Sequence, residues 1–147
     1  MILATQDLGR CRGRVTMVDG AFDPIHPGHI AYLEAAAGLG LPVLCNVSSD
    51  EYVALKHAPF LSQGERAAII DAVCWVEFTH LSRLSTNEVL RLARPHSYAK
   101  GADWRGRLPE EELATCAELG IEVVYLDTVL DSSTAILERY ASREQAR

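Results

Sequence analysis

The feature that most constrains the fold of this chain is a regular alternation of short apolar runs with longer runs of helical character. Buried strands are predicted at residues 15–20, 42–50, 75–80, 96–101 and 121–127. Helices are predicted between and after them, at residues 27–40, 62–73, 85–94, 109–120 and 132–143. This order indicates an α/β fold, a Rossmann-like, doubly wound parallel sheet of about five strands with helices on both faces.

The length of 147 residues fits one domain, which we expect to span residues 14–147. Residues 1–13 lack a clear periodicity and are predicted to be an N-terminal extension, either flexible or packed on a partner. No internal repeat or low-complexity segment interrupts the pattern.

Composition excludes several classes of function. A formal net charge of −6 argues against a nucleic-acid-binding protein, because such proteins neutralise phosphates with a basic surface. No apolar run is long enough to cross a membrane, and the first residues are too weakly apolar for a secretory signal, so we expect a cytoplasmic protein. The four cysteines stand singly, without a CxxC pair, so neither a zinc site nor a redox motif is expected.

Polar clusters follow four of the predicted strands, at residues 20–29, 48–50, 100–103 and 127–134. In a parallel sheet with helices on both faces, ligands bind outside the carboxyl ends of the strands, at the point where the strand order reverses. The four clusters are therefore expected to meet at one site.

The first cluster, GAFDPIHPGH, has the composition of an anion-binding turn. Gly20 and Gly28 bracket a strand-to-helix turn, which can present backbone N–H groups and a helix N-terminus to an anion. His26 and His29 lie three residues apart at the helix start, on one side of it. Two imidazoles in this place can donate hydrogen bonds to a phosphoryl group as charge develops in a transition state.

This stretch matches the GxFDxxHxGH signature, and the chain resembles the cytidylyltransferase-like nucleotidyltransferases from Val15 to about Tyr140. Further matches follow in the family's order, in the runs SSDEY, GERAAII, YAKGADW and SSTAI and at Lys56. The resemblance implies a nucleotidyltransferase. In that reaction an acceptor oxygen attacks the α-phosphorus of a nucleoside triphosphate (NTP) and pyrophosphate leaves. It also implies Mg²⁺ with the NTP, a phosphorylated small molecule as acceptor, and a homodimer.

The resemblance assigns roles residue by residue. Catalytic residues are expected at His26, His29, Lys56 and Arg66. Nucleotide-binding residues are expected at Gly20, Ala21, Phe22, Asp23, Gly28, Lys100, Gly101, Asp103, Ser132, Ser133 and Thr134. Substrate-binding residues are expected at Asp50 and Trp104.

Some of these residues have a second interpretation. Asp23 either holds a magnesium-bound phosphate or caps the turn, and Trp104 either stacks on the base or belongs to the core. Ser132 to Thr134 can cap the last helix as well as contact the triphosphate. Arg66 lies in the first turn of its helix, where the dipole disfavours a cation, so a separate role is expected for it.

Two branches of the family compete. YAKGADW is similar to the KGGD pattern of the heptose 1-phosphate adenylyltransferase type, and the arginine of the glycerol-3-phosphate cytidylyltransferase type is missing before SSTAI. A sugar phosphate is therefore the expected acceptor, with ATP as first and CTP as second choice of nucleotide. Departures from the family pattern occur at Ala102, at Leu130 and in VSSD, close to the parts that choose base and acceptor.

Two other classes of function fit the sequence less well. A non-catalytic nucleotide-binding regulatory module would keep the fold, but such a module need not retain both histidines together with Lys56 and Arg66. A dinucleotide-binding oxidoreductase would need a GxGxxG after the first strand, which this chain does not have.

Overall fold

A computed structural model describes residues 1–128 and 133–145 of the chain. Its strands are β1 (Ile2–Leu3), β2 (Thr16–Gly20), β3 (Val43–Ser48), β4 (Phe78–Ser82), β5 (Ser97–Gly101) and β6 (Glu122–Leu126). Its α-helices are α1 (Pro27–Ala37), α2 (Asp50–Ala54), α3 (Gln63–Asp71), α4 (Thr86–Ala93), α5 (Glu110–Leu119) and α6 (Ser133–Gln145). Two short 3₁₀ helices, η1 (Thr5–Cys11) and η2 (Ala102–Trp104), complete the elements.

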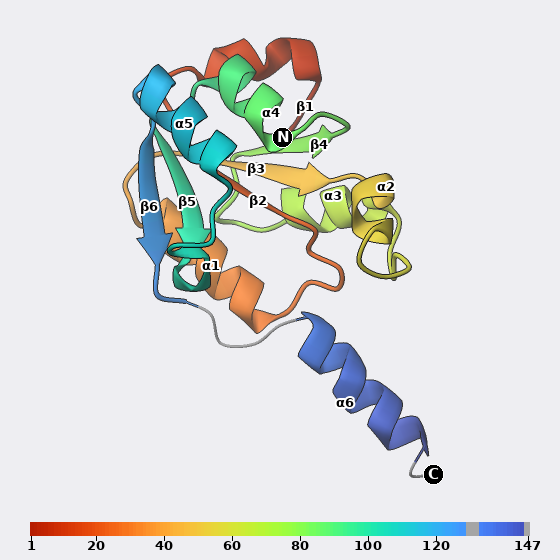
Figure 1. Cartoon of the computed structure of the whole chain (residues 1–147). Coiled ribbons are helices and arrows are strands. Elements are labelled where there is room, and N and C mark those ends of the chain that lie inside the picture. Colours follow the sequence, from red (N-terminus) through yellow and green to blue (C-terminus); the bar gives the residue numbers. More distant parts are fainter. Residues whose placement is uncertain (129–132, 146–147) are drawn as a thin grey trace.

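The strands form one parallel sheet in the order β1-β4-β3-β2-β5-β6 (Figure 1). From β2 the chain first adds β3 and β4 on one side and then crosses to add β5 and β6 on the other. The strand order therefore reverses between β2 and β5, as the alternating pattern predicted. The expected fold class and all five expected strands are confirmed.

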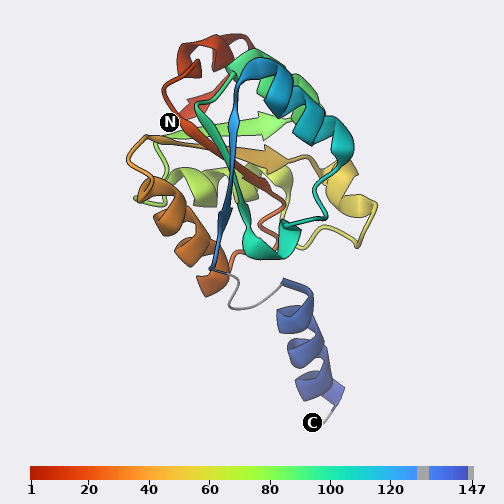
Figure 2. The same cartoon turned by 60° about the vertical axis from the view of Figure 1, so that its left-hand side comes forward.

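Helices cover both faces of the sheet, and each face has its own apolar core (Figures 1 and 2). Met17, Leu44 and Tyr98 point to the face covered by η1, α4 and α5. Val18 and Ala99, one position further along their strands, point to the face covered by α1 and α3. This alternation is the period of two that a strand buried on both faces requires.

Local signals fix the ends of several helices. Ser62 and Glu65 form the capping box predicted at the start of α3. Ser85 and Glu88 form a second one at the start of α4. Gly120 ends α5 with a φ of 67°, a conformation that glycine adopts without strain.

The expectation for residues 1–13 is corrected by the structure. Ile2 and Leu3 pair in parallel with β4 and add a sixth strand at the edge of the sheet. In η1, Leu8 and Cys11 are fully buried in the core of the α4–α5 face. The segment belongs to the domain, and the sequence did not reveal it because a two-residue strand and a 3₁₀ helix are too short to produce a periodic pattern.

One further difference concerns a helix. The short helix α2 follows β3 where only a polar strand end was expected, with Ser49 as its N-cap. The predicted last helix is observed as α6, which extends away from the sheet in both views (Figures 1 and 2). Ser132 and Leu130 lie outside the described residues.

None of the helices in the described part of the chain combines the length and apolar character that crossing a membrane requires.

Candidate active site

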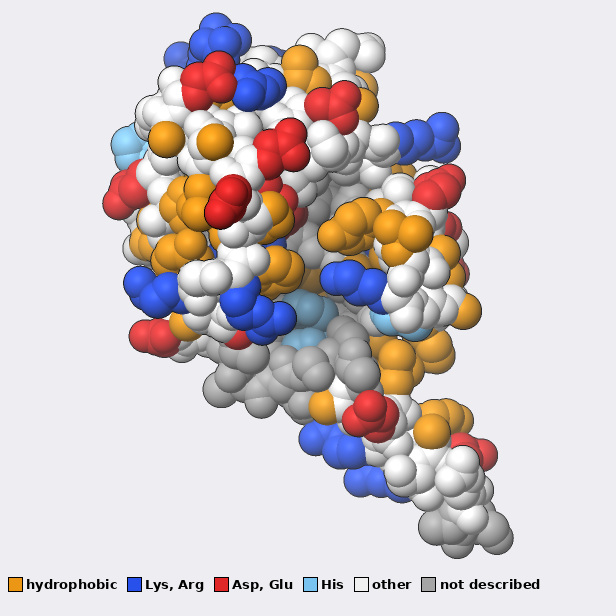
Figure 3. Space-filling view, viewed as in Figure 1, with side chains coloured by type: hydrophobic (Ala, Val, Ile, Leu, Met, Phe, Trp, Pro, Cys, Tyr) orange, Lys and Arg blue, Asp and Glu red, His pale blue; other side chains and the backbone are white. Residues whose placement is uncertain are grey.

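A cavity of about 960 Å³ opens at the carboxyl ends of β2, β3, β4 and β5. Its walls come from the turn after β2, the start of α1, α2 and the residues after it, the loop into α4, and η2. In the space-filling view, histidine side chains are visible in a hollow flanked by lysine and arginine side chains (Figure 3). Three of the predicted clusters, at residues 20–29, 48–50 and 100–103, thus meet where the strand order reverses, together with the end of β4, which was not predicted. Of the fourth predicted cluster, at residues 127–134, Thr128 lines the cavity and residues 129–132 lie outside the described part of the chain.

His26 is the N-cap of α1 and lines this cavity. Its Nδ1 accepts a hydrogen bond from the backbone N–H of Gly28 at 3.1 Å. When the ring is neutral, its proton must therefore reside on Nε2, which makes Nε2 a hydrogen-bond donor. Gly20 leaves room for this turn, because a Cβ at that position would come within 3.1 Å of the Phe22 ring.

His29 stacks on His26, with 3.8 Å between the ring centroids and 27° between the ring planes. Phe22 packs edge-on against its ring at 5.0 Å. Burial, followed by the neighbouring His26, lowers the pKa of His29 to about 4, so the ring is neutral at pH 7. Its Nδ1 is buried and bonds to none of the described residues, which leaves a polar atom for a ligand to satisfy.

Asp23 holds the loop that precedes α3. Its two carboxylate oxygens accept the backbone N–H groups of Phe60 and Leu61, each at 2.8 Å. The side chain is buried and does not line the cavity. This geometry favours the structural interpretation of Asp23 over a role in binding magnesium or nucleotide, which stays a prediction.

Arg66 is 1% exposed and joins three segments at the edge of the site. Its guanidinium donates to the backbone carbonyls of Ala21, Ser48 and Leu61, at 2.6, 2.9 and 3.2 Å. It also forms an ion pair with Asp50 at 2.8 Å, and this bond lowers the pKa of the Asp50 carboxyl. Neither residue lines the cavity, so the arrangement supports a role of Arg66 in positioning the turn after β2. Direct contact of Arg66 with phosphate, or of Asp50 with substrate, stays a prediction.

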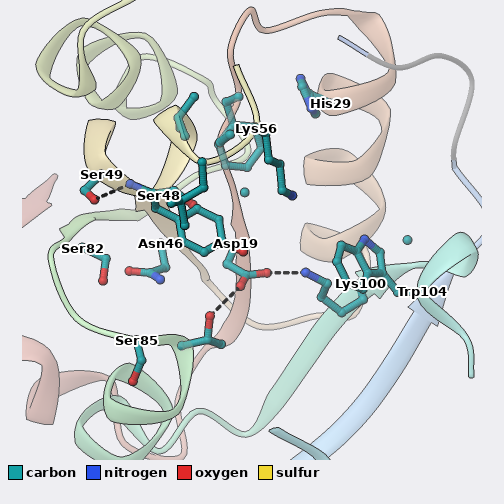
Figure 4. A pocket seen from close by; sticks show the side chains of 18 of the residues that line it. Asp19, His29, Asn46, Ser48, Ser49, Lys56, Ser82, Ser85, Lys100 and Trp104 are labelled. Carbon is teal, nitrogen blue, oxygen red and sulfur yellow. Dashed lines mark hydrogen bonds and ion pairs between the residues drawn. The ribbon is translucent and has the colours of Figure 1, made fainter. Parts of the chain in front are cut away.

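Lys56 follows α2 and lines the cavity from its exposed rim. Its Nζ lies 5.7 Å from the centroid of the Tyr52 ring. In Figure 4 the side chain reaches over the cavity on the side where His29 lies. Lys56 therefore lines the same cavity as His29, and its catalytic role stays a prediction.

Lys100 is buried at the end of β5 and bonds to Asp19 at the end of β2, with 2.7 Å between Nζ and Oδ1 (Figure 4). Asp19 also accepts hydrogen bonds from the hydroxyls of Tyr98, at 3.0 Å, and Thr86, at 3.2 Å. The pair spans the two strands between which the order reverses. The charge of Lys100 is therefore balanced within the protein before any ligand arrives.

Trp104 covers this ion pair, with Nζ of Lys100 4.3 Å from the centroid of the ring. The ring is half-buried and lines the cavity together with Gly101 and the exposed Asp103. A flat aromatic surface with one side open to the cavity is suited to stack on a base or pack against an acceptor. Both roles stay predictions.

The remaining predicted residues lie in two groups. Gly20, Ala21, Phe22 and Gly28 line the cavity as expected. Ser133 and Thr134 start α6, where the backbone is described but their side chains are not.

Sequence reasoning missed several residues that line the cavity, among them Asp19, Tyr32, Asn46, Ser82 and Glu112. Burial and then Asp19 raise the pKa of Glu112, and its carboxylate lies 3.2 Å from the Tyr98 hydroxyl. Asp19 and Asn46 occupy the same register position on β2 and β3. A polar residue near the end of an otherwise apolar strand was the available signal for both of them.

Comparison with known proteins places the chain in a family. Residues 17–139 match the family described as cytidylyltransferase-like. The chain belongs to the cytidylyltransferase-like family. The expected recognition as a nucleotidyltransferase domain is thereby confirmed.

Curated relatives and a solved structure resemble this cytidylyltransferase-like domain. The bifunctional protein HldE of Desulfatibacillum aliphaticivorans is 31% identical over 92% of the chain, and that of Nitratiruptor sp. is 30% identical over 95%. These matches cover only 28% and 30% of the two relatives, so the chain spans less than a third of their length. The crystal structure of a lipopolysaccharide core biosynthesis protein from Thermoplasma volcanium has 25% identity and a TM-score of 0.69, over 78% of this chain and 97% of that one.

Replacement of Arg66 tests its positioning role. We expect Arg66→Lys to lower the free energy of unfolding by about 3 kcal/mol or more, because an ammonium cannot bridge the same three carbonyls and Asp50. Urea unfolding measures the loss. Arg91→Lys, at an exposed pair with Glu118, is the matched control and should change stability little. A stable Arg66→Lys protein with weakened nucleotide binding would instead indicate direct phosphate contact.

Titration of His29 tests the electrostatics of the histidine pair. We expect a pKa of about 4 in the free protein, because burial and His26 disfavour the charged ring. A bound triphosphate favours the imidazolium, so the pKa should rise when a non-hydrolysable NTP is added. NMR of ring-labelled histidine measures both values, and the spectrum of His29→Gln assigns the resonance. A free-protein pKa near the unperturbed 6.5 would contradict the geometry.

Proposed function

We propose that this domain transfers a nucleotidyl group from an NTP to a phosphorylated small molecule, a sugar phosphate, and releases pyrophosphate. The observation that carries the proposal is the stacked pair His26–His29 at the start of α1, facing a cavity at the point where the strand order reverses. Membership of the cytidylyltransferase-like family supports the reaction type.

The chemistry needs positioning and charge stabilisation, with no nucleophile from the protein. An oxygen of the acceptor phosphate attacks the α-phosphorus, and the bond from that phosphorus to the bridging oxygen of pyrophosphate breaks. Negative charge gathers on the non-bridging oxygens and on the leaving pyrophosphate. The Nε2–H of His26, the neutral ring of His29 and the N-terminus of α1 can stabilise that charge, and Lys56 can close on the phosphates from the rim.

Magnesium enters this proposal as part of the Mg–NTP substrate. The charged side chains that line the cavity are Lys56, Arg83 and Lys100 against Asp19, Glu51, Asp103 and Glu112. Lys100 is already paired with Asp19, so these residues cannot neutralise a triphosphate by themselves. No cluster of three or more metal-binding side chains occurs among residues 1–128 and 133–145. The cation would therefore come with the nucleotide, as Mg²⁺ does at many phosphate-transfer sites.

A sugar phosphate is favoured as acceptor over an alcohol phosphate of the glycerol type. The relatives named HldE, and the lipopolysaccharide core biosynthesis protein, support this branch by similarity alone. ATP is the first choice of nucleotide and CTP the second, because the run from Tyr98 to Trp104 is similar to the pattern of the adenylyltransferase type.

The test is a pyrophosphate-release screen of ATP, CTP, GTP and UTP, each with Mg²⁺, against sugar, alditol and amino-alcohol phosphates. We expect turnover with a sugar phosphate. His26→Ala and His29→Ala should then lose about 10²-fold in kcat with little change in nucleotide affinity, since both groups act on charge that develops in the transition state.

His96→Ala is the control, because His96 is exposed and precedes β5, at the end of the sheet away from the cavity. Near-normal kcat in both histidine variants would contradict the assigned roles. Nucleotide binding without turnover for any pair would favour a regulatory module.

A further inference from the structure

One part of the cavity lies on the α4 side of the sheet, and most of the side chains that line it are polar and uncharged, although the exposed Arg83 and the apolar Leu84 also line the cavity there. We call this part the α4-side lobe; its residues are Asn46, Ser48, Ser82, Ser85, Thr86 and Asn87. Asn46 and Ser48 lie on β3 and Ser82 on β4, and Ser85 to Asn87 form the start of α4. Figure 4 shows Asn46, Ser82 and Ser85 together, on the opposite side of Asp19 from Lys100 and Trp104.

Most hydroxyl protons of this lobe are already engaged within the protein. Ser82 donates to the carbonyl of Leu84, Ser85 to the carboxylate of Glu88, and Thr86 to Asp19. These hydroxyls shape the lobe but have no second proton to offer a ligand.

Asn46 is different because a hydrogen bond with His80 fixes the orientation of its side-chain amide. His80 occupies the register position beside it on β4, and Nδ1 of His80 lies 2.8 Å from Oδ1 of Asn46. A carbonyl oxygen only accepts, so Nδ1 of His80 carries the proton and donates. Burial lowers the pKa of His80, so its ring is neutral and Nε2 can accept from the hydroxyl of Thr5, 3.0 Å away.

This chain of contacts leads from the surface to the cavity. Thr5 is exposed in η1, His80 is 1% exposed, and Asn46 is 4% exposed. With Oδ1 turned to His80, the NH₂ group of Asn46 has no partner among the described residues. A donor held in one orientation discriminates better than a mobile one, because less conformational freedom is lost on binding.

We propose that Asn46 is a specificity residue that donates a hydrogen bond to a hydroxyl of the acceptor, and that Thr5 and His80 are positioning residues that orient its amide. The α4-side lobe then takes the hydroxylated, uncharged body of the acceptor, while its phosphate lies toward His26 and His29. Asn87 can complete the recognition, since its Oδ1 is buried without a partner in the described part of the chain. This inference rests on the proposed function.

The first test measures KM for acceptor and for NTP separately, with the pair found by the pyrophosphate screen. Asn46→Asp retains the oxygen that faces His80 and removes the donor, and Asn46→Ala removes both. We expect either change to raise the acceptor KM about tenfold or more and to leave the NTP KM within about twofold. Thr16→Val is the control, because it removes a buried hydrogen bond to Ser97 outside the cavity.

The positioning role of Thr5 and His80 is tested by replacing Thr5, the residue at the surface. Thr5→Val should raise the acceptor KM by a smaller factor than the Asn46 variants do, without changing the NTP KM. Thr5→Ser retains the hydroxyl, so its acceptor KM should equal that of the wild type. If Thr5 only stabilised the fold, Thr5→Val would not raise the acceptor KM while leaving the NTP KM unchanged. Equal rises in both KM values for the Asn46 variants, a rise in the NTP KM alone, or no rise in either would overturn the proposal.

Binding separates failure of this inference from failure of the proposed function. If no pair turns over, saturation-transfer NMR with glucose 1-phosphate and glycerol 3-phosphate as probes still reports on the lobe. Binding to the wild type and to Thr16→Val that is lost in Asn46→Ala supports the subsite even without catalysis. Equal binding to all three proteins, or binding to none, overturns it.

Discussion

The reversal of strand order between β2 and β5 is the constraint on which the site depends. The helices that follow these two strands, α1 and α5, pack on opposite faces of the sheet. The carboxyl ends of the strands are therefore not covered, and a cavity forms there. The ion pair of Asp19 and Lys100 joins the two strands at this point and is covered by Trp104. A buried pair is stable only when it is well satisfied, and here Tyr98 and Thr86 supply further hydrogen bonds.

Buried polar contacts then hold the segments around the cavity in place. Arg66 joins the turn after β2 to the end of β3 and to the loop before α3, and Asp23 binds that loop through two backbone N–H groups. The two histidines therefore follow a turn that buried contacts hold in place, while Lys56 lies on the exposed rim of the cavity. Rigid histidines and an accessible lysine suit a reaction in which positioning and charge stabilisation do the work.

The sequence was informative where a pattern repeats or a motif is local. Apolar runs with intervening helical periods predicted five strands of the sheet. The GAFDPIHPGH stretch predicted two histidines together at a helix start, and the stacked rings of His26 and His29 agree with that. The sequence could not show that the N–H groups of Arg66 donate to backbone carbonyls, because one of those carbonyls lies 45 residues away along the chain. It also missed β1 and the neighbours of Asn46, because register across β1, β4 and β3 is a property of the folded sheet.

The proposed reaction requires one cavity to hold the triphosphate against the histidine pair and the acceptor beside Asn46. A crystal structure with a non-hydrolysable NTP and Mg²⁺ tests it most directly. We expect the α-phosphate within hydrogen-bond distance of Nε2 of His26, with the α4-side lobe left open for an acceptor. A nucleotide whose phosphates lie in the α4-side lobe, or outside the cavity, would contradict it.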